Sequence, residues 1–238
     1  PKTLFPYTTL FRSLADAAVC RGSFHAVLRT DVPDTVFSAF SAALQKAQAD
    51  GSLLTASLFR CESHLFFYAE GLNRPFTPQG LCPALDAALL PWPPALGETS
   101  PRPWAAMQPY FYHDIPTAAA DWQQGRCPQR RRGRIALLPP DKWCSYMEHH
   151  LRIVTEGLVE GDRWHLICVQ EGVLFSYLEE PRTNVNIRHQ PGAHSPELDA
   201  WIAADPESHF ARFTPEQKAH PDGGHNFVFL PRIAGTED

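Results

Sequence analysis

The sequence lacks any long apolar run. Proline and polar residues interrupt even the segment from Leu85 to Leu96, so no stretch approaches the roughly 18 consecutive apolar residues of a membrane-spanning helix. It also lacks an excess of positive charge, because 21 lysines and arginines stand against 26 aspartates and glutamates and give a net charge of −5. Nucleic-acid binding depends on clustered basic side chains that neutralise phosphates. We therefore expect neither a membrane nor a nucleic acid as partner.

Motifs of well-known metal and catalytic sites are also missing. The six cysteines form no C-x-x-C pair, and the eleven histidines form neither H-E-x-x-H nor a Cys/His finger, which are spacings that hold zinc. The sequence contains no G-x-x-x-x-G-K-[ST] phosphate loop and no G-x-S-x-G nucleophile turn. We expect no metal site, and we expect reduced thiols in a cytoplasmic protein.

The composition is that of a folded protein. Hydrophobic residues make up 44% of the 238 residues and charged residues 20%, close to the average of globular domains. Residues 1–13 begin without methionine, show no periodicity and resemble a translated adapter or assembly artefact. Five arginines between Arg126 and Arg134 lie among glycine and proline, which favours a solvated linker. The expected segments are a non-native leader (1–13), a first, degenerate repeat (14–115), an Arg/Pro/Gly linker (116–132) and a second repeat (133–238).

A short motif occurs twice, 109 positions apart. Leu65–Glu70 and Leu174–Glu179 both read L-F-x-Y-x-E. At the same offset, without a gap, Leu28 falls on Leu137, so that apolar positions of two expected strands coincide. This constant offset predicts two related halves.

The hydrophobic pattern predicts a similar order of elements in both halves, with a helix before the last strand in the second half only. Alternating polarity indicates strands, and apolar residues three and four apart indicate amphipathic helices. In the first half we expect strand 24–30, helix 32–49, strands 53–60 and 65–70, and strand 105–113. In the second half we expect strand 133–138, helix 141–159, strands 164–170 and 173–179, helix 195–204 and strand 226–230.

This order is typical of a ferredoxin-like β-α-β-β-α-β unit, in which helices cover one face of an antiparallel sheet. The uncovered faces of two such units can pack together. We therefore predict an α+β protein of two tandem ferredoxin-like repeats packed as a pseudo-dimeric α/β-barrel. A cavity between the sheet faces is the expected place for a small ligand.

The helix expected at 141–159 carries the most informative residues. Tyr146 and His150 stand four positions apart, which places a phenol and an imidazole on one helical face, about one turn apart. The adjacent His149 must point elsewhere, and we expect it at the surface. At the 109-residue offset the first half has Phe37 and Ser41 instead. The polar pair occurs in one half only, so we expect the working pocket in the second repeat.

These motifs resemble those of the L-rhamnose mutarotases, small ferredoxin-like proteins whose first helix carries Y-x-x-x-H and whose last strand is aromatic and ends in Leu-Pro. The sequence offers Tyr146 and His150, then Leu174–Glu179, and finally an aromatic run that ends at Leu230 and Pro231. The resemblance covers about residues 133–232. It implies a fused form of this family and an isomerase that interconverts the α and β anomers of a deoxyhexose.

The resemblance also implies roles for single residues. Opening and closing a pyranose ring takes one acid and one base, and histidine exchanges protons near neutral pH. His150 is then the proton carrier and Tyr146 its hydrogen-bonding or acid partner, and the reaction uses no cofactor. His165 is a candidate second proton carrier, and His165, Trp164 and Trp201 are the candidate substrate-binding residues. Trp201 would stack on the apolar face of the sugar, although a plain core position is the favoured interpretation of both tryptophans.

Two other functions remain open. Cofactor-free monooxygenases and haem-handling proteins share the pseudo-dimeric barrel, and a non-catalytic module that binds a small ligand would fit the degenerate first half. The two halves would bury in one chain what single copies bury in a homodimer. We therefore expect a monomer, with a homodimer as the alternative.

Overall fold

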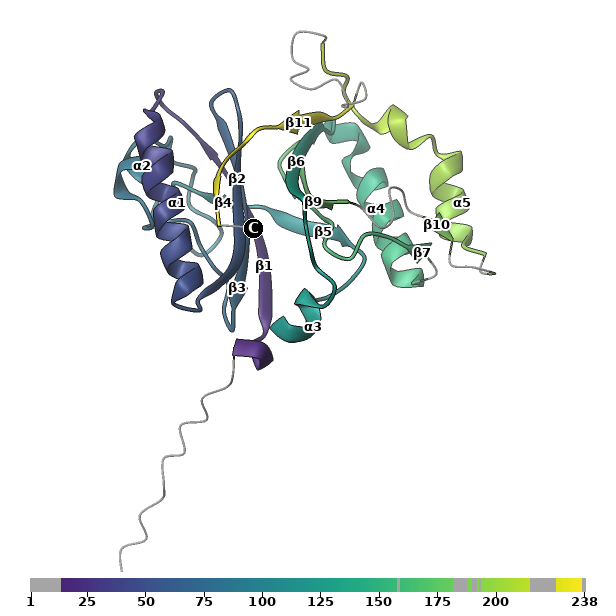
Figure 1. Ribbon diagram of the computed structural model, residues 1–238. Helices are drawn as coiled ribbons and strands as arrows, with labels where there is room; N and C mark the ends of the chain where they lie inside the picture. The colour runs from purple at the N-terminus through teal and green to yellow at the C-terminus, as the bar shows by residue number, and fades with distance from the viewer. Residues whose placement is uncertain are drawn as a thin grey trace, which may run out of the picture.

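The computed structural model describes residues 14–157, 159–181, 188–189, 192, 194–214 and 226–236, and the predicted leader at 1–13 lies outside them. The described residues form two five-stranded antiparallel sheets and a small two-stranded one. The two large sheets lie face to face, with α1 and α2 on the outer side of one and α4 and α5 on the outer side of the other (Figure 1).

The elements follow the predicted order closely. The first half contains η1 (Leu14–Asp16), β1 (Val19–Val27), α1 (Asp34–Ala49), β2 (Leu53–Cys61), β3 (His64–Leu72), α2 (Pro83–Ala87), β4 (Ala105–Ala106) and β5 (Gln108–Tyr112). The second contains α3 (Ala119–Gln123), β6 (Arg130–Leu137), α4 (Pro140–Glu156), β7 (Val159–Glu160), β8 (Leu166–Gln170), β9 (Val173–Glu180), β10 (Arg188–His189), α5 (Pro196–Ala203), η2 (Pro206–His209), β11 (Val228–Leu230) and β12 (Arg232–Gly235). Every helix and strand predicted from periodicity is present, but the strand expected at 105–113 is divided into β4 and β5.

The two large sheets exchange strands. Their orders are β12-β2-β3-β1-β4 and β11-β6-β9-β8-β5. β4 pairs with β1 of its own half, whereas β5 crosses over and pairs with β8 of the other sheet. In the same way β11 pairs with β6, and β12 returns to pair with β2. Figure 1 shows both crossings, in teal for β5 and in yellow for the C-terminal segment. The fold is thus two tandem ferredoxin-like repeats in a pseudo-dimeric α/β-barrel, as predicted.

The strand register corrects the predicted offset. Leu65 of β3 pairs with Ala26, whereas its counterpart Leu174 of β9 pairs with Ala136. The hairpins are therefore related by 109 positions, but the first strands by 110. The prediction of one gapless offset is wrong by one residue, because the second half has one residue fewer between its first strand and its hairpin than the first half has.

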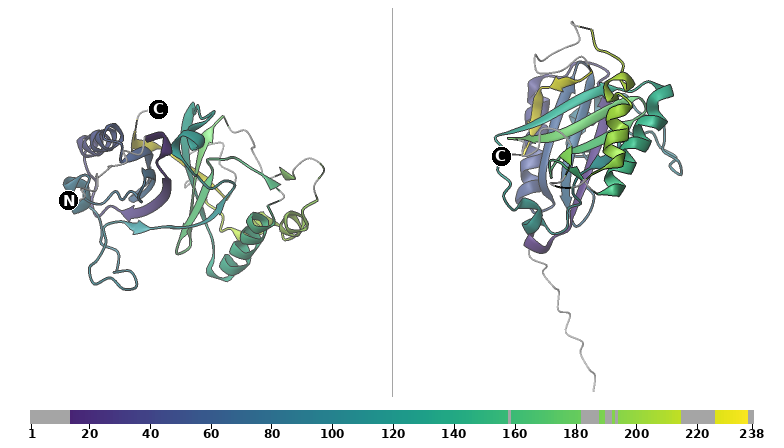
Figure 2. Two further views of the ribbon diagram at one scale, coloured as in Figure 1. Left: turned by 90° about the horizontal axis from the view of Figure 1, so that it is seen from below. Right: turned by 90° about the vertical axis from the view of Figure 1, so that its right-hand side faces the viewer.

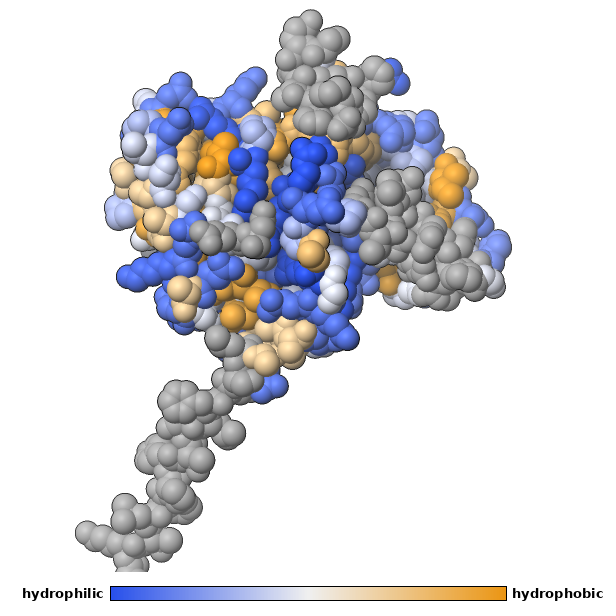
Figure 3. Space-filling view, viewed as in Figure 1, coloured by the Kyte–Doolittle hydropathy of each residue, from blue (hydrophilic) through white to orange (hydrophobic). Residues whose placement is uncertain are grey.

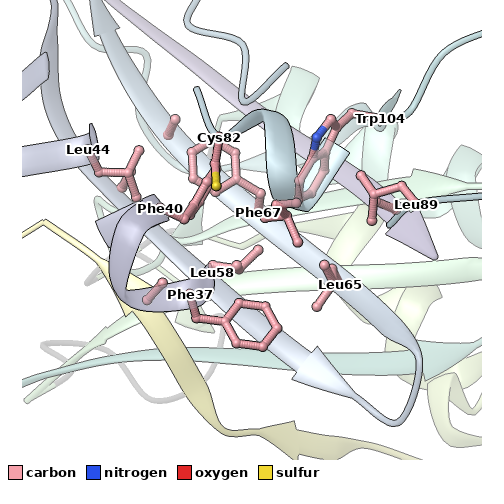
Figure 4. Packing of buried hydrophobic residues seen from close by; sticks show 14 of the residues in the cluster. Phe37, Phe40, Leu44, Leu58, Leu65, Phe67, Cys82, Leu89 and Trp104 are labelled. Atoms are coloured by element: carbon pink, nitrogen blue, oxygen red, sulfur yellow. The ribbon is translucent and has the colours of Figure 1, made fainter. Parts of the chain in front are cut away.

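Helix α1 packs closely on the outer face of the first sheet. Phe37, Phe40 and Leu44 are buried against Leu58 and Phe67 in one apolar cluster (Figure 4). The spacing of these helical residues places them on one face. Burial of such large side chains is worth about 1.5–3 kcal/mol each, so this half is held mainly by its own core.

Aromatic rings from both sheets fill the space between the sheets. Phe59 and Phe66 of the first sheet lie 5.8 and 5.4 Å from Phe175 of the second, measured between ring centroids. Gly133 of β6 makes this packing possible, because a Cβ atom there would lie 2.7 Å from the Phe59 ring. The ligand cavity predicted between the sheet faces is replaced here by packed rings, and the cavity described below lies on the helix side of the second sheet.

The two copies of the L-F-x-Y-x-E motif meet at the centre of the molecule. Glu70 and Glu179 are both buried, and Arg126 lies between them, 2.7 and 2.6 Å from the two carboxylates. Burial by itself raises the pKa of Glu70, but the charge and hydrogen bonds of Arg126 outweigh it and lower this pKa. The prediction of a solvated arginine linker is therefore wrong for Arg126, and also for Arg131, whose side chain is 7% exposed near Glu179.

The surface and the thiols are those of an ordinary folded domain. On the face seen in Figure 3, hydrophilic side chains predominate and hydrophobic ones form small scattered patches. No helix among the described residues is long and apolar enough to cross a membrane. All six cysteines are free thiols.

Candidate functional site

A cavity of about 350 Å³ lies between the second sheet and helices α4 and α5. Figure 2, on the right, looks onto this side of the molecule, where the two helices lie over the strands of the second sheet. The volume is within the range of small-molecule sites. Its walls include aromatic rings from both helices and from the sheet, among them Phe111, Tyr146, Trp201, Phe210 and Phe227.

Two features of the sequence position α4. Pro140 occupies the first turn, where its missing N–H costs nothing, and Gly157 ends the helix in the left-handed conformation with φ 68°. Between these ends Tyr146, His150 and Ile153 form the buried face. Tyr146 and His150 thus point from one side of the helix toward the cavity, with 4.2 Å between their ring centroids.

His150 is held as a neutral base. Its Nδ1 atom lies 2.9 Å from the main-chain oxygen of Tyr146. A carbonyl oxygen can only accept, so Nδ1 carries the proton and Nε2 keeps its lone pair. The side chain is 3% exposed, and burial lowers the pKa of His150 to about 4. At neutral pH the imidazole is therefore uncharged and able to take up a proton.

Tyr146 is enclosed by rings. The centroids of Tyr110, Trp201 and Phe210 lie 5.9, 5.2 and 5.1 Å from its own, in edge-to-face arrangements. Burial raises the pKa of Tyr146 to about 12, so the phenol keeps its proton at neutral pH. It can donate a hydrogen bond to a ligand oxygen but is a poor base.

The cavity wall that faces α4 is formed by residues at or beside the strands β5, β6 and β8 of the second sheet. Phe111 of β5 lies edge-on to His150, with 4.9 Å between centroids, and also contacts His113 and His165 at 4.9 and 6.1 Å. Arg134 of β6 lines the cavity with its guanidinium carbon 4.2 Å from the Phe227 ring centroid. The wall therefore combines a cation with two further imidazoles.

The structure brings four of the five predicted site residues to this cavity. Tyr146, His150, His165 and Trp201 line it, and Trp201 is also part of the core, 7% exposed. Trp164 lies elsewhere: its indole Nε1 donates to the main-chain oxygen of Trp122. The predicted substrate role of Trp164 therefore finds no support in its position. His149, expected at the surface, is half-buried, and its ring centroid lies 5.4 Å from that of Trp201.

Sequence reasoning missed Phe111, His113 and Arg134. The first two belong to the first half, whereas the pocket was expected in the second, and only the strand exchange brings them to the second sheet. Arg134 was assigned to a solvated arginine cluster. The sequence feature that could have placed Arg134 in the site is the alternation of side chains along β6. Because Ile135 faces the other sheet, Arg134 must face the helices.

The first half does not repeat the lining residues of this cavity. The strand register shows which residues of the two halves are equivalent: Ala234 pairs with Leu58 in the first sheet, as Phe111 pairs with Ile167 in the second. The resulting pairs are Ala234 for Phe111, Ala56 for His165 and Phe24 for Arg134. Small and apolar side chains thus replace every one of these cavity residues, and a hollow of about 440 Å³ beside α1 is lined instead by residues such as Phe37, Ser41 and Arg60. Among the described residues, no three His, Cys, Asp or Glu side chains are grouped to hold a metal ion.

Comparisons with known proteins give matches of fold only. No family model matches the chain, and no curated protein does. The fold matches a proposed monooxygenase of Fusobacterium nucleatum subsp. nucleatum ATCC 25586 at 11% identity, with 93% of this chain and 95% of that chain covered and a TM-score of 0.43. A proposed monooxygenase of Lactobacillus acidophilus NCFM matches at 6% identity, 92% and 96% coverage and a TM-score of 0.41. An anthrone oxidase-like protein matches at 9% identity, 94% coverage of both chains and a TM-score of 0.37. At this similarity no residue roles carry over.

These findings contradict the predicted resemblance to the L-rhamnose mutarotases. The structural matches are named as monooxygenases and an oxidase-like protein, and no family model or curated protein supports a sugar isomerase. The predicted mutarotase activity and isomerase class are therefore wrong. The physical reason lies in the motifs: Tyr177 and Glu179 face the other sheet, and Leu230 ends the strand before the crossing to it. These residues build the fold, so their spacing carries no information about a substrate.

Proposed function

We propose that the cavity between the second sheet and α4–α5 binds a planar aromatic compound with an acidic C–H group, and that His150 removes this proton. The resulting carbanion then reacts with dioxygen, so that the chain acts as a cofactor-independent oxygenase. The observation that carries this proposal is the state of His150. Its Nδ1–H donates a hydrogen bond to the carbonyl oxygen of Tyr146, which leaves the lone pair of Nε2 available to take up a proton. A positioned general base of this kind contributes typically 10²–10⁴-fold to rate.

The walls suit a planar apolar ligand. Phe111, Trp201 and Phe210 line the cavity, and contacts between aromatic rings are favourable beyond the area they bury. Rings that surround the base therefore favour an aromatic substrate.

Groups of both charges line the cavity, because Asp162 and Glu207 stand there together with Arg134. Removing a proton from carbon leaves negative charge, which in a phenolic substrate spreads onto its oxygen atoms. The guanidinium of Arg134 supports this charge across the cavity, and the protonated phenol of Tyr146 can donate to one of the oxygens. Fixed groups of this type stabilise developing charge without reorganisation.

The reaction balances without any other reductant. The carbanion adds to dioxygen and forms a C–O bond, and protonation of the peroxide gives a hydroperoxide. Loss of water, with departure of the second hydrogen from the same carbon, converts the original CH₂ group to a carbonyl. One oxygen atom enters the product and the other leaves as water, and the substrate supplies all four electrons.

Oxygen uptake with 1,8-dihydroxyanthrone tests the proposal, because this compound is planar, phenolic and acidic at its CH₂ group. We expect the wild-type chain to consume one dioxygen per 1,8-dihydroxyanthraquinone formed, above the rate without protein. His150→Gln should lower this rate by about 10²-fold or more, and the neighbouring His149→Gln, as matched control, should change it less than about threefold. Equal rates in the wild type and His150→Gln, or binding of the anthrone without uptake of dioxygen, would contradict the proposal.

A further inference from the structure

Tyr110 lies behind the two polar rings of the candidate site. Its ring is edge-on to Tyr146 and to His150, with 5.9 and 5.5 Å between centroids. It comes from β5, the strand that crosses between the sheets, whereas the other two residues come from α4. Of the described residues, those that line the cavity include Tyr146 and His150 but not Tyr110. A ligand in the cavity would therefore touch the two α4 rings, and Tyr110 could act on it only through them.

The hydroxyl group of Tyr110 is a buried donor. The side chain belongs to the apolar cluster beneath α4, and its oxygen atom is shielded from water. Within the described part of the chain, no group accepts its proton at ordinary hydrogen-bond geometry. An unpaired buried hydroxyl destabilises a fold, and phenylalanine would fill the same space without that cost. The hydroxyl at this position therefore indicates a role beyond packing.

The neighbouring hydroxyl is that of Tyr146. Burial raises the pKa of both phenols, and the contact between the two hydroxyls raises the pKa of Tyr110 further but lowers that of Tyr146. A hydrogen bond that favours the ionised form of its acceptor lowers the pKa of the acceptor. The opposite directions thus make Tyr110 the donor and Tyr146 the acceptor. The geometry is looser than that of an ordinary hydrogen bond, as is common in catalytic sites before a ligand tightens them.

We propose that Tyr110 is a positioning residue, which donates a hydrogen bond to the phenol oxygen of Tyr146 and so directs the Tyr146 proton toward an oxygen atom of the ligand. This inference rests on the proposed function and deepens it. Tyr146 has one hydroxyl proton, so when it donates to the ligand its own oxygen can only accept. Donation to an anion makes that oxygen a stronger acceptor, because hydrogen bonds in a chain polarise one another. The chain from Tyr110 to the ligand tightens as negative charge develops, which is where stabilisation accelerates a reaction.

The groups around the two phenols keep them protonated near neutral pH. Arg134, on the cavity wall, lowers the pKa of both, but the effect of burial is larger, and Glu207 raises the pKa of Tyr146. Cys168 lies near Tyr110, and burial raises the pKa of this thiol to about 12. The two phenols can therefore stabilise a negatively charged oxygen atom but cannot take a proton from carbon. The ligand that they recognise is one whose oxygen gains charge when the base removes its carbon-bound proton.

Titration of Tyr146 tests the hydrogen bond without any ligand. In protein labelled with 3-fluorotyrosine, fluorine makes the phenols more acidic, and the ¹⁹F signal of position 146 is assigned by its loss in Tyr146→Phe. Tyr110→Phe keeps the ring and removes the hydroxyl. We expect it to lower the acid dissociation constant of residue 146 roughly threefold to tenfold, and Tyr112→Phe, the same change two residues along β5, should leave it unchanged. An equal constant in wild type and Tyr110→Phe would overturn the inference.

A double-variant cycle tests whether the Tyr110 hydroxyl acts through Tyr146. With 1,8-dihydroxyanthrone as substrate, Tyr110→Phe should lower kcat about threefold to tenfold with little change in KM. The same change should have no further effect in the Tyr146→Phe background, because the acceptor is then absent. Tyr112→Phe should turn over as wild type does. An equal loss of kcat with and without the Tyr146 hydroxyl would overturn the inference.

The two measurements distinguish the positioning role from the proposed function. A weaker acid at residue 146 in Tyr110→Phe, without any uptake of dioxygen by the wild type, would support the hydrogen bond while the oxygenase assignment fails. Uptake of dioxygen at the same rate in wild type and Tyr110→Phe would contradict the positioning role while the oxygenase assignment stands.

Discussion

The rings of Tyr68 and Tyr177 are stacked face to face, with 3.6 Å between centroids and 8° between planes. Each hydroxyl donates to the glutamate two residues later in its own strand, Glu70 or Glu179, at 2.5 and 2.6 Å. The two halves of the chain therefore meet at equivalent residues of the repeated motif. Two carboxylates come close together here, and a buried cation between them is required to make the arrangement stable.

Arg126 is that cation, so replacing it should destabilise the whole fold. Arg126→Met would leave two buried carboxylates without their shared partner, and we expect the free energy of unfolding to fall by about 3–5 kcal/mol. Arg130→Met is the matched control, because the Arg130 side chain is 66% exposed and lies 3.9 Å from Glu180; its cost should stay below about 1 kcal/mol. Urea unfolding measures both values. Similar costs for the two variants would show that the buried cluster does not hold the halves together.

Gly133 should resist any side chain. A Cβ atom at this position would lie 2.7 Å from the ring of Phe59 in the facing sheet. We expect Gly133→Ala to cost about 1–3 kcal/mol through overpacking, and we expect the additional change Phe59→Leu to recover part of that loss. Thermal unfolding of the single and double variants measures this coupling. Additive effects of the two changes would contradict the close approach of the sheets.

Lowering the pH should weaken the fold through two buried histidines. Burial lowers the pKa of both His150 and His25 to about 4, from an ordinary value of 6.5. Above pH 6.5 both histidines are neutral in the folded and the unfolded chain, so their full contribution to stability is present. As the pH falls below 6.5, the unfolded chain takes up protons before the folded protein does, and the free energy of unfolding declines between pH 6.5 and 4. A difference of this size in pKa corresponds to about 3 kcal/mol for each group. Urea unfolding at pH 7 and pH 5 should show the decline, and His150→Gln should show roughly half of it; an equal decline in that variant would exclude His150 as a source.

The sequence predicts the fold well because its signals are local. Alternating strands, an amphipathic α1 and the repeated L-F-x-Y-x-E motif all follow from periodicity, and each is present in the structure. What could not be predicted depends on long-range pairing. The exchange of β5 and β12 between the sheets has no local signature, so Phe111 and His113 could not be assigned to the site.

The candidate site was predicted in part for a similar reason. The spacing of Tyr146 and His150 depends only on the helix, and the structure places both rings on the cavity. The arginine cluster was misinterpreted because its sequence does not reveal the buried glutamates that Arg126 meets across the interface. The repeated motif was in turn taken as a sign of function, although its tyrosines and glutamates build the centre of the fold.

Formation of the substrate anion without oxygen tests the central claim most directly. When the wild-type chain is mixed with 1,8-dihydroxyanthrone in deuterated buffer near pH 7 in the absence of dioxygen, His150 should remove the proton transiently, and the CH₂ hydrogens should exchange for deuterium faster than without protein. His150→Gln should still bind the anthrone, measured by quenching of tryptophan fluorescence, but should not accelerate the exchange. The account is contradicted if the variant accelerates the exchange as much as wild type does, or if wild type binds the anthrone and leaves the exchange rate unchanged.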